Sequence, residues 1–318
     1  MVREGQAIRY YLVCDGGGTK TEFVLFDQEG KILSKYLGEG SNALFIDEER
    51  AMESVALGIM TCLERSCLEL PSLEHIVLFI PGFRTCLPLL VKKLGYADIS
   101  ILSDEENALY GALGKSPGIV VLSGTGSFAV GRSSSGEKVV CGGWGPLIGD
   151  QGSGYHIGIM ALSSIARRHD EGNAGSRMGS LVCAKLGLDD VRLLRRRIYQ
   201  PGLSRSEIAS LSLVVEEAAK EGDLDASLII DSAAKELADM ALVVSRRIDE
   251  TEPRVALVGG IANMGDLIML PFSMHILARI PKAVILPSRF SPILGAMRYV
   301  LDTFEGQDMP VAGPGFYN

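Results

Sequence analysis

The chain has 318 residues, of which 47% are hydrophobic and 22% are charged, so a disordered or collagen-like protein is excluded. Its 31 basic and 39 acidic side chains give a formal net charge of −8, which argues against nucleic acid or an anionic membrane as the main partner. At about 150 residues per domain, the length predicts two domains. The 37 glycines exceed the roughly 22 expected from ordinary usage, and the excess gathers in a few loops.

We expect a cytoplasmic protein with no signal peptide and no membrane span. The first residues pass directly into an apolar, strand-like segment, and no apolar run approaches the ~18 residues that would cross a bilayer. The six cysteines form no C-x-x-C pair, which indicates reduced and mostly buried thiols.

Strand patterns open the chain. Apolar residues at 10–14 and 22–27 predict two strands, and a turn at 28–31 leads to a third strand that begins at Ile32. The glycines at 16–18 therefore join two strands, whereas a dinucleotide fingerprint or a Walker loop would open a helix. The next predicted elements are a helix at 47–66, a strand at 76–80, a helix to about 94, a strand at 99–102 and a helix through Leu113.

The same strand–glycine turn–strand–turn–strand pattern then recurs. Its second copy has strands at 119–122, 128–130 and 138–140, with a glycine turn between the first two. Such a repeat indicates an internal duplication with a boundary near residue 115. We therefore expect an N-terminal domain at 1–115 and a C-terminal domain at 116–318.

The remainder of the second half is mainly helical. Ser204 with Glu207 fits a capping box that heads a helix to about 220. The other predicted elements are helices at 154–168, about 224–250 and 292–303, and strands at 255–258 and 283–286.

The first candidate site is the loop from Asp15 to Thr21. Glycines allow positive φ and the close approach of an anion, and successive N–H groups in such a turn form a nest for a phosphate. The hydroxyls of Thr19 and Thr21 would add donors, and Asp15 could hold Mg²⁺ through water. The alternative is a tight hairpin that binds nothing. The candidate nucleotide-binding residues here are Gly16, Gly17, Gly18, Thr19, Lys20 and Thr21.

Two further glycine turns are candidates for the same ligand. The second loop comprises Gly124, Thr125, Gly126 and Ser127, and as the second copy of the first loop it could hold phosphates. On its own, this sequence could be an ordinary turn. The third turn, Gly259 and Gly260, follows a strand, and its small residues would leave room for a flat adenine ring. A helix-opening turn explains it equally well.

A glycine-rich segment at 142–154 holds Trp144, the only tryptophan of the chain, and Asp150. An aromatic ring beside a carboxylate and backbone donors suits a sugar, which has apolar ring faces and polar hydroxyls. The alternative is a structural loop with a tryptophan in the core.

Asp104 directly follows the predicted strand at 99–102. A carboxylate in this position could accept a hydroxyl proton during phosphoryl transfer, and the alternative is a helix N-cap. Glu105 and Glu106 adjoin it, so spacing alone does not choose among the three. Asn42 lies in a predicted loop, where it could contact a ligand or shape a turn.

These motifs, in this order, resemble the N-acetylglucosamine kinase family of the actin-like superfamily, which also holds other sugar kinases and chaperone ATPases. DGGGTKT at 15–21 and GTGS at 124–127 look like its two phosphate motifs, and VALVGGIAN at 255–263 looks like its adenosine motif. GGWG followed by GD-x-GS, at 142–153, looks like its sugar-side signature. The resemblance implies an α/β fold of two ribonuclease H-like domains, with ATP and sugar in a central cleft.

The resemblance also implies roles for single residues. It implies that Asp104 is the catalytic base, because the residues that follow keep the family's spacing. It implies that Asn42 and Asp150 bind sugar hydroxyls, with backbone contacts from Gly143 and Trp144. It further implies that the helix at 292–303 packs back on the first domain, and it is compatible with a homodimer.

Three positions depart from the family's pattern: Ser103, Gln151 and Phe83. They lie in or beside loops that would line the sugar pocket, so ATP binding is better supported than the identity of the sugar.

We therefore hypothesise an ATP-dependent kinase that uses Mg²⁺ and phosphorylates N-acetylglucosamine or a related amino sugar or hexose. The alternative is a non-kinase ATPase that acts as an activator or switch, or a sugar-sensing regulator. The dehydratase- and reductase-activating ATPases of the same family bind an iron–sulfur cluster between subunits through cysteines, and no cysteine pairing in this sequence suggests such a cluster.

Overall fold

The computed structural model describes residues 7–18, 20–43, 46–173, 175–287 and 291–307. The chain divides into two compact units: unit 1 comprises residues 1–115 and 290–318, and unit 2 comprises residues 116–289. Each unit is built on one five-stranded sheet. Among the described residues, no helix combines the length and the apolarity that crossing a membrane would require.

The strands of unit 1 are β1 (Tyr10–Gly16), β2 (Lys20–Asp27), β3 (Ile32–Glu39), β4 (Leu73–Phe79) and β5 (Ile99–Leu102). Their order in the sheet is β3-β2-β1-β4-β5. The first three pair as an antiparallel meander, and β4 and β5 continue the sheet parallel to β1. Alternate residues of β1 point to opposite faces, so Leu12 joins one apolar core and Val13 joins another.

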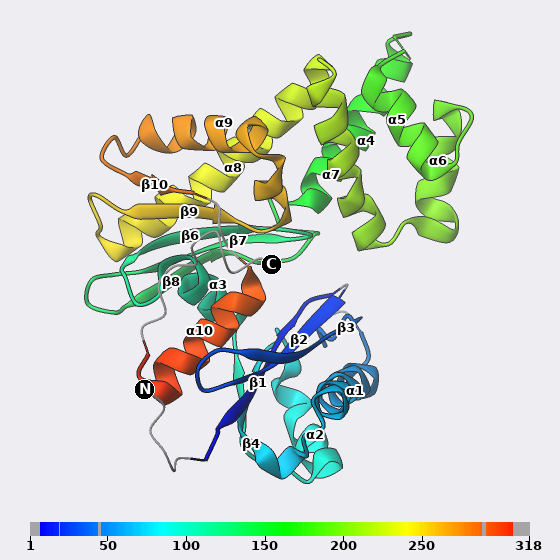
Figure 1. The fold of residues 1–318 in the computed structure, drawn as a ribbon. Coiled ribbons are helices and arrows are strands. Elements are labelled where there is room, and N and C mark those ends of the chain that lie inside the picture. Colours follow the sequence, from blue (N-terminus) through cyan, green and yellow to red (C-terminus); the bar gives the residue numbers. More distant parts are fainter. Residues whose placement is uncertain (1–6, 19, 44–45, 174, 288–290, 308–318) are drawn as a thin grey trace. The chain divides into compact units, whose positions relative to one another are not determined.

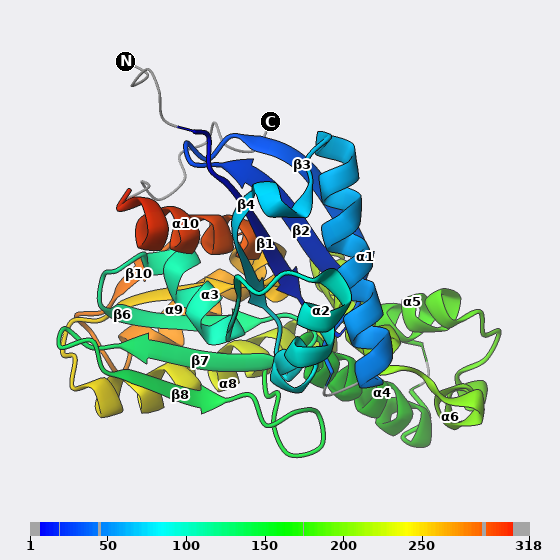
Figure 2. The ribbon, with the colours of Figure 1, turned by 90° about the horizontal axis from the view of Figure 1, so that it is seen from below.

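Helices cover both faces of this sheet. They are α1 (Glu48–Ser66), α2 (Leu87–Leu94), α3 (Asp104–Leu113) and α10 (Pro292–Glu305). Helices α1 and α2 pack on the face that holds Leu12, and Figure 2 shows α1 lying along β2 and β3. Helix α10 packs on the opposite face, beside α3 (Figure 1).

Helix α10 belongs to unit 1 although all of unit 2 precedes it in the sequence. Its residues Met297, Val300 and Leu301 are buried in the same core as Tyr11 of β1. Against α3 the contact is close, because a Cβ at Gly295 would lie 2.9 Å from the Cα of Gly111. This tight packing holds α10 on the first sheet.

The strands of unit 2 are β6 (Gly118–Ser123), β7 (Ser127–Arg132), β8 (Lys138–Gly142), β9 (Arg254–Val258) and β10 (Val284–Leu286). Their order is β10-β9-β6-β7-β8. Again an antiparallel meander of three strands is extended by two parallel strands beside the first of them. The two sheets therefore repeat one plan, as the recurring sequence pattern predicts.

The helices of unit 2 are α4 (Gly154–Asp170), α5 (Arg177–Leu186), α6 (Leu194–Arg197), α7 (Arg205–Lys220), α8 (Leu224–Ile248) and α9 (Asp266–Leu277). Helix α8 packs on the sheet and α9 packs on α8 (Figure 1). Helices α4 and α7 approach each other closely, because a Cβ at Gly158 would overlap the carbonyl group of Ile208. The predicted capping box at the start of α7 is present: Ser204 Oγ accepts from the Glu207 amide, and Glu207 accepts from the Ser204 amide.

Candidate functional site

The first glycine loop connects β1 to β2 in unit 1 and is hydrogen-bonded to residues that follow β3. The Gly17 amide donates to the Lys20 carbonyl over 3.0 Å, which closes the turn. The amides of Ser41 and Asn42 then donate to the Gly17 carbonyl over 3.0 and 3.2 Å. The structure therefore brings Asn42 beside this loop, as a buried residue. Thr19 lies outside the described residues.

Gly16 of this loop serves close packing and not an unusual backbone angle. Neither Gly16 nor Gly17 has a φ in the left-handed region, contrary to the expectation from sequence. A Cβ at Gly16 would instead overlap Ser41 Oγ and lie 2.8 Å from a side-chain carbon of Ile80. The Thr21 hydroxyl, expected as a phosphate donor, lies 2.7 Å from Ser41 Oγ, and Thr21 has no exposed surface. Thr21 therefore holds the loop in place, and among the described residues of the loop Gly18 and Lys20 are exposed.

Asp15 ends the apolar part of β1 and is held by a residue that sequence reasoning missed. Asn107 Nδ2, from α3, donates to Asp15 Oδ1 over 2.6 Å. Burial raises the pKa of Asp15 to about 6, and the Asn107 hydrogen bond opposes that rise. Asn107 is itself only 2% exposed, so its amide is committed to the interior of unit 1.

Asp104 is the first residue of α3, and the expected alternative that it caps this helix is wrong. Ser103 is the N-cap, with extended backbone angles and an Oγ that accepts from the Glu106 amide over 3.3 Å. The Asp104 carboxyl is thus not required by the cap. Burial raises its pKa to about 7, with further contributions from the Glu105 carboxyl and from the charge of Asp15. A carboxyl with such a pKa can exchange a proton near neutral pH.

The second glycine loop joins β6 to β7 in unit 2 and is bound to the start of α4. The Gly124 amide donates to the Gly126 carbonyl over 2.9 Å. The Gly154 and Tyr155 amides donate to the carbonyls of Gly124 and Thr125 over 2.8 and 3.3 Å.

The side chains of Ser123 and Ser127 complete this attachment. Ser123 Oγ donates to the Gly152 carbonyl over 2.9 Å, and Ser127 Oγ donates to the Gln151 carbonyl over 2.6 Å. Two motifs that lie more than 20 residues apart in the sequence, GTGS and GD-x-GS, therefore form one cluster in unit 2.

The third glycine turn joins the same cluster. Gly259 follows β9 with a φ of +98°, which favours glycine, and a Cβ there would lie 2.8 Å from the carbonyl carbon of Ser123. Gly260 opens a short 3₁₀ helix (Gly260–Met264), so the helix-opening alternative is present as well. Nothing lies within 4 Å of a Cβ at Gly260 among the described residues, which leaves the open space that a flat ring would need.

Asp150 points into this cluster, and here again sequence reasoning missed the partner. Its Oδ1 accepts from the Ser127 amide over 3.2 Å, and its Oδ2 accepts from Arg205 Nη2 over 2.6 Å. Asp150 is 3% exposed, and its backbone has a φ of +60°. A buried aspartate needs a counter-charge, so an arginine elsewhere in the sequence could have been expected as its partner. No other sequence signal indicates Arg205.

Trp144 is 74% exposed, so the alternative of a core tryptophan is wrong. Two residues that follow in the same loop, Leu147 and Ile148, are also exposed. Gly143 precedes the ring with a φ of +75°, and its amide donates to the Ser127 carbonyl over 3.0 Å. The loop therefore starts at the glycine cluster and presents an aromatic surface to solvent.

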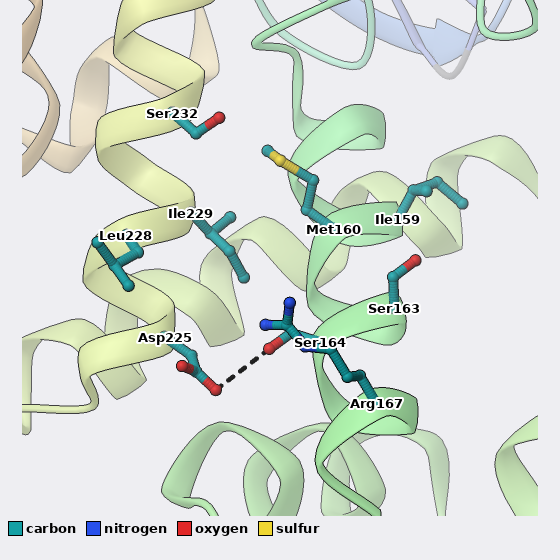
Figure 3. Close-up of a pocket in the computed structure, with 9 residues that line it drawn as sticks. All are labelled: Ile159, Met160, Ser163, Ser164, Arg167, Asp225, Leu228, Ile229 and Ser232. Atoms are coloured by element: carbon teal, nitrogen blue, oxygen red, sulfur yellow. Dashed lines mark hydrogen bonds between the residues drawn. The ribbon is translucent and has the colours of Figure 1, made fainter. Parts of the chain in front are cut away.

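Unit 2 also has a groove of about 400 Å³ between α4 and α8, which holds none of the residues predicted from sequence (Figure 3). Its floor is apolar, and Ser164 Oγ donates to Asp225 Oδ2 over 3.2 Å at one end. The polar and apolar residues that line it are Ile159, Met160, Ser163, Ser164, Arg167, Asp225, Leu228, Ile229 and Ser232.

Known proteins resemble the chain over most of its length. The model of the BadF/BadG/BcrA/BcrD ATPase family matches residues 14–299. The chain is 30% identical over 298 residues to the N-acetylmuramic acid/N-acetylglucosamine kinase of Clostridium acetobutylicum, covering 91% of this chain and 97% of that protein. It is also 30% identical over 318 residues to the N-acetyl-D-glucosamine kinase of Dictyostelium discoideum, covering 92% of this chain and 98% of that protein.

A solved structure from Chromobacterium violaceum, provisionally named as an N-acetylglucosamine kinase, has a TM-score of 0.73 and 24% identity, with 92% of this chain and 99% of that chain covered. This likeness confirms the predicted α/β fold of two actin-like ATPase units. The extent of the family match, together with the two relatives at 30% identity, confirms the predicted relationship. The chain belongs to the BadF/BadG/BcrA/BcrD ATPase family.

Proposed function

We propose that this protein is an ATP-dependent sugar kinase that transfers the γ-phosphate to a hydroxyl of N-acetylglucosamine or a related amino sugar or hexose. The observation that carries the proposal is Asp104: a partly buried carboxyl that no cap requires, whose pKa of about 7 suits a general base. The named activities of the two relatives at 30% identity support an amino sugar as the acceptor.

In this mechanism Asp104 accepts the proton of the attacking sugar hydroxyl. The bond between that oxygen and the γ-phosphorus forms as the bond from the γ-phosphorus to the bridging oxygen of ADP breaks. N–H groups of the two glycine loops would bind the phosphates, and the turn at Gly259 and Gly260 would receive the adenine. Asn42, Gly143, Trp144 and Asp150 would bind the sugar, with the exposed indole face of Trp144 suited to an apolar ring face.

The residues around Asp15 fit a magnesium ion. Mg²⁺ prefers oxygen ligands and commonly takes only one or two carboxylates, with phosphate and water oxygens completing its coordination. Asp15 offers such a carboxylate, because Asn107 engages Oδ1 and the desolvated surroundings favour a nearby cation. No group of three or more His, Cys, Asp or Glu side chains that could bind a metal occurs in the described part of the chain. When bound, Mg²⁺ would neutralise negative charge on the phosphate oxygens.

The proposal is tested by ADP release with ATP, Mg²⁺ and a panel of amino sugars and hexoses, measured for the wild type and for Asp104→Asn. We expect sugar-dependent turnover in the wild type and a loss of roughly 10²-fold or more in the variant, with binding of an ATP analogue retained. Glu106→Gln, on the same helix, is the matched control and should keep most of the activity.

Two results would overturn the proposal. Near-normal turnover in Asp104→Asn would show that the Asp104 carboxyl is not the base. ATP hydrolysis that no sugar stimulates would instead favour an activator or switch protein.

We also predict a cytoplasmic location and a homodimer. Gel filtration with light scattering tests the homodimer.

A further inference from the structure

Arg205 holds a position in unit 2 that no sequence motif assigns. It is the first residue of α7, and its guanidinium reaches Asp150 with an Nη2–Oδ2 distance of 2.6 Å. The carboxylate that it meets is the proposed sugar ligand, so the inference that follows rests on the proposed function. Only 3% of the Asp150 side chain and 25% of the Arg205 side chain are exposed, so removing Arg205 would leave the Asp150 charge buried without its counter-charge.

The backbone at Asp150 indicates that the side-chain contacts are needed. Among the described residues, three that are not glycine have a positive φ: Cys67, Asp150 and Asp249. Cys67 and Asp249 end α1 and α8, where a left-handed residue is common. Asp150 ends no helix, and it keeps this conformation while its carboxylate bonds to Arg205 and to the Ser127 amide. Such local strain persists only where the surroundings hold it.

The second glycine loop is shaped to admit this pair. A Cβ at Gly126 would lie 2.6 Å from Arg205 Nη2 and 2.9 Å from Asp150 Oδ1. Glycine at 126 therefore lets the guanidinium and the carboxylate rest against the loop that is proposed to bind phosphate. Through Ser127, whose amide donates to Asp150, the carboxylate is part of that loop's hydrogen bonding as well.

The start of α7 is fixed independently of this contact. The capping box of Ser204 and Glu207 holds the first turn, and Glu207 also pairs with Arg197 over 2.9 Å. The glycines of α4 bring α7 close, since a Cβ at Gly154 would lie 3.2 Å from the Ala209 carbonyl oxygen. Arg205 therefore projects from a rigid helix end, as a group that fixes another side chain should.

We propose that Arg205 is a positioning residue that fixes Asp150 between the sugar motif and the second phosphate loop. It acts through Asp150: it sets the direction of the carboxylate toward the sugar hydroxyls and, by the same bond, holds the loop at Ser127. Losing Arg205 would leave Asp150 as a buried carboxylate with one hydrogen bond fewer, free to turn away from the geometry that the sugar requires.

The kinetic test is a double-mutant cycle with Arg205→Ala, Asp150→Ala and the double variant. We expect Arg205→Ala to lower kcat/KM for the sugar by roughly tenfold to 10²-fold, with a much smaller change in the KM for ATP. In the Asp150→Ala background, removing Arg205 should cause no further loss, because both changes remove the same interaction. Arg205→Lys should recover part of the loss, since lysine keeps the charge but not the planar geometry. Independent, additive losses would overturn the inference.

Arg197→Ala is the matched control, because it removes another arginine–carboxylate pair at the start of α7 while leaving Asp150 untouched. We expect its sugar kinetics to stay within about twofold of the wild type, as is typical for an exposed pair. If Arg205→Ala and Arg197→Ala change the sugar kinetics equally, the effect comes from the stability of the start of α7. That result would refute a specific role for Arg205.

A readout without turnover separates this inference from the proposed function. Hydrogen exchange of the peptide that contains the Ser127 amide should speed up in Arg205→Ala and not in Arg197→Ala, since that amide donates to Asp150. If the wild type shows no sugar-dependent activity, the proposed function fails while this exchange result still decides the role of Arg205. Unchanged exchange in Arg205→Ala contradicts the role.

Discussion

Asp15 and Asp104 have raised pKa values for the same physical reason. Both carboxyls lie in desolvated surroundings, and the charge of Asp15 adds to the pKa of Asp104. A carboxyl whose pKa is higher in the folded than in the unfolded chain stabilises the fold fully at pH values below its ordinary pKa, near 4. That contribution is lost as the pH rises through about 6 for Asp15 and about 7 for Asp104. At neutral pH the proposed base therefore opposes folding in the absence of ligands.

Asp104→Asn should for this reason be stabilised as well as inactive. We expect the variant's Tm to exceed that of the wild type at pH 8, with a difference that shrinks as the pH falls toward 4, because asparagine has no charge to desolvate. Differential scanning calorimetry across this pH range measures the effect without any substrate. A Tm difference that does not change with pH would show that Asp104 is not the group that titrates.

The partners of Asp15 and Asp150 show why the site could be predicted only in part. Both aspartates follow from sequence motifs, whereas Asn107 and Arg205 lie 92 and 55 residues away from them in the chain. Neither partner stands in a predicted ligand-binding motif, so only the fold brings each of them to its aspartate. Ser103 illustrates a second limit: serine and aspartate are equally good N-caps, and only the structure, through the backbone angles of Ser103 and the hydrogen bond from the Glu106 amide to its Oγ, identifies Ser103 as the cap.

At the scale of whole elements, local patterns were sufficient for most of the fold. The alternation of apolar residues in the strands, the helical spacing of α1 and the capping box of α7 are local signals, and each element forms where they indicate. The contact between α4 and α7 has no such signal, because it depends on glycines that would otherwise weaken a helix. Gly158 lies against the backbone of Ile208, where any side chain would collide.

Gly158→Ala tests this contact by the sign of its effect. In an exposed helix interior, replacing glycine by alanine stabilises by about 1 kcal/mol. Here the new methyl group would overlap the Ile208 carbonyl, so we expect a lower Tm instead. Ser163→Ala, at an exposed position of the same helix, should leave the Tm unchanged or slightly raised. Thermal unfolding of the purified variants checks both, and a stabilised Gly158→Ala protein would refute the close contact.

At the scale of the whole molecule, the two units share one strand plan and differ in what they carry. Unit 1 holds Asp15, Asn42 and Asp104 with the first glycine loop, and unit 2 holds the second loop with Asp150 and Arg205. A duplicated sheet explains why each unit has a glycine loop after its first strand.

Identification of the product distinguishes a sugar kinase from an ATPase that phosphorylates no sugar. Purified protein is incubated with ATP, Mg²⁺ and each of a panel of amino sugars and hexoses, and the products are analysed by mass spectrometry alongside the amount of ADP. We expect a sugar monophosphate in amounts equal to the ADP formed, for at least one amino sugar or hexose. ADP and inorganic phosphate without any phosphorylated sugar would contradict it.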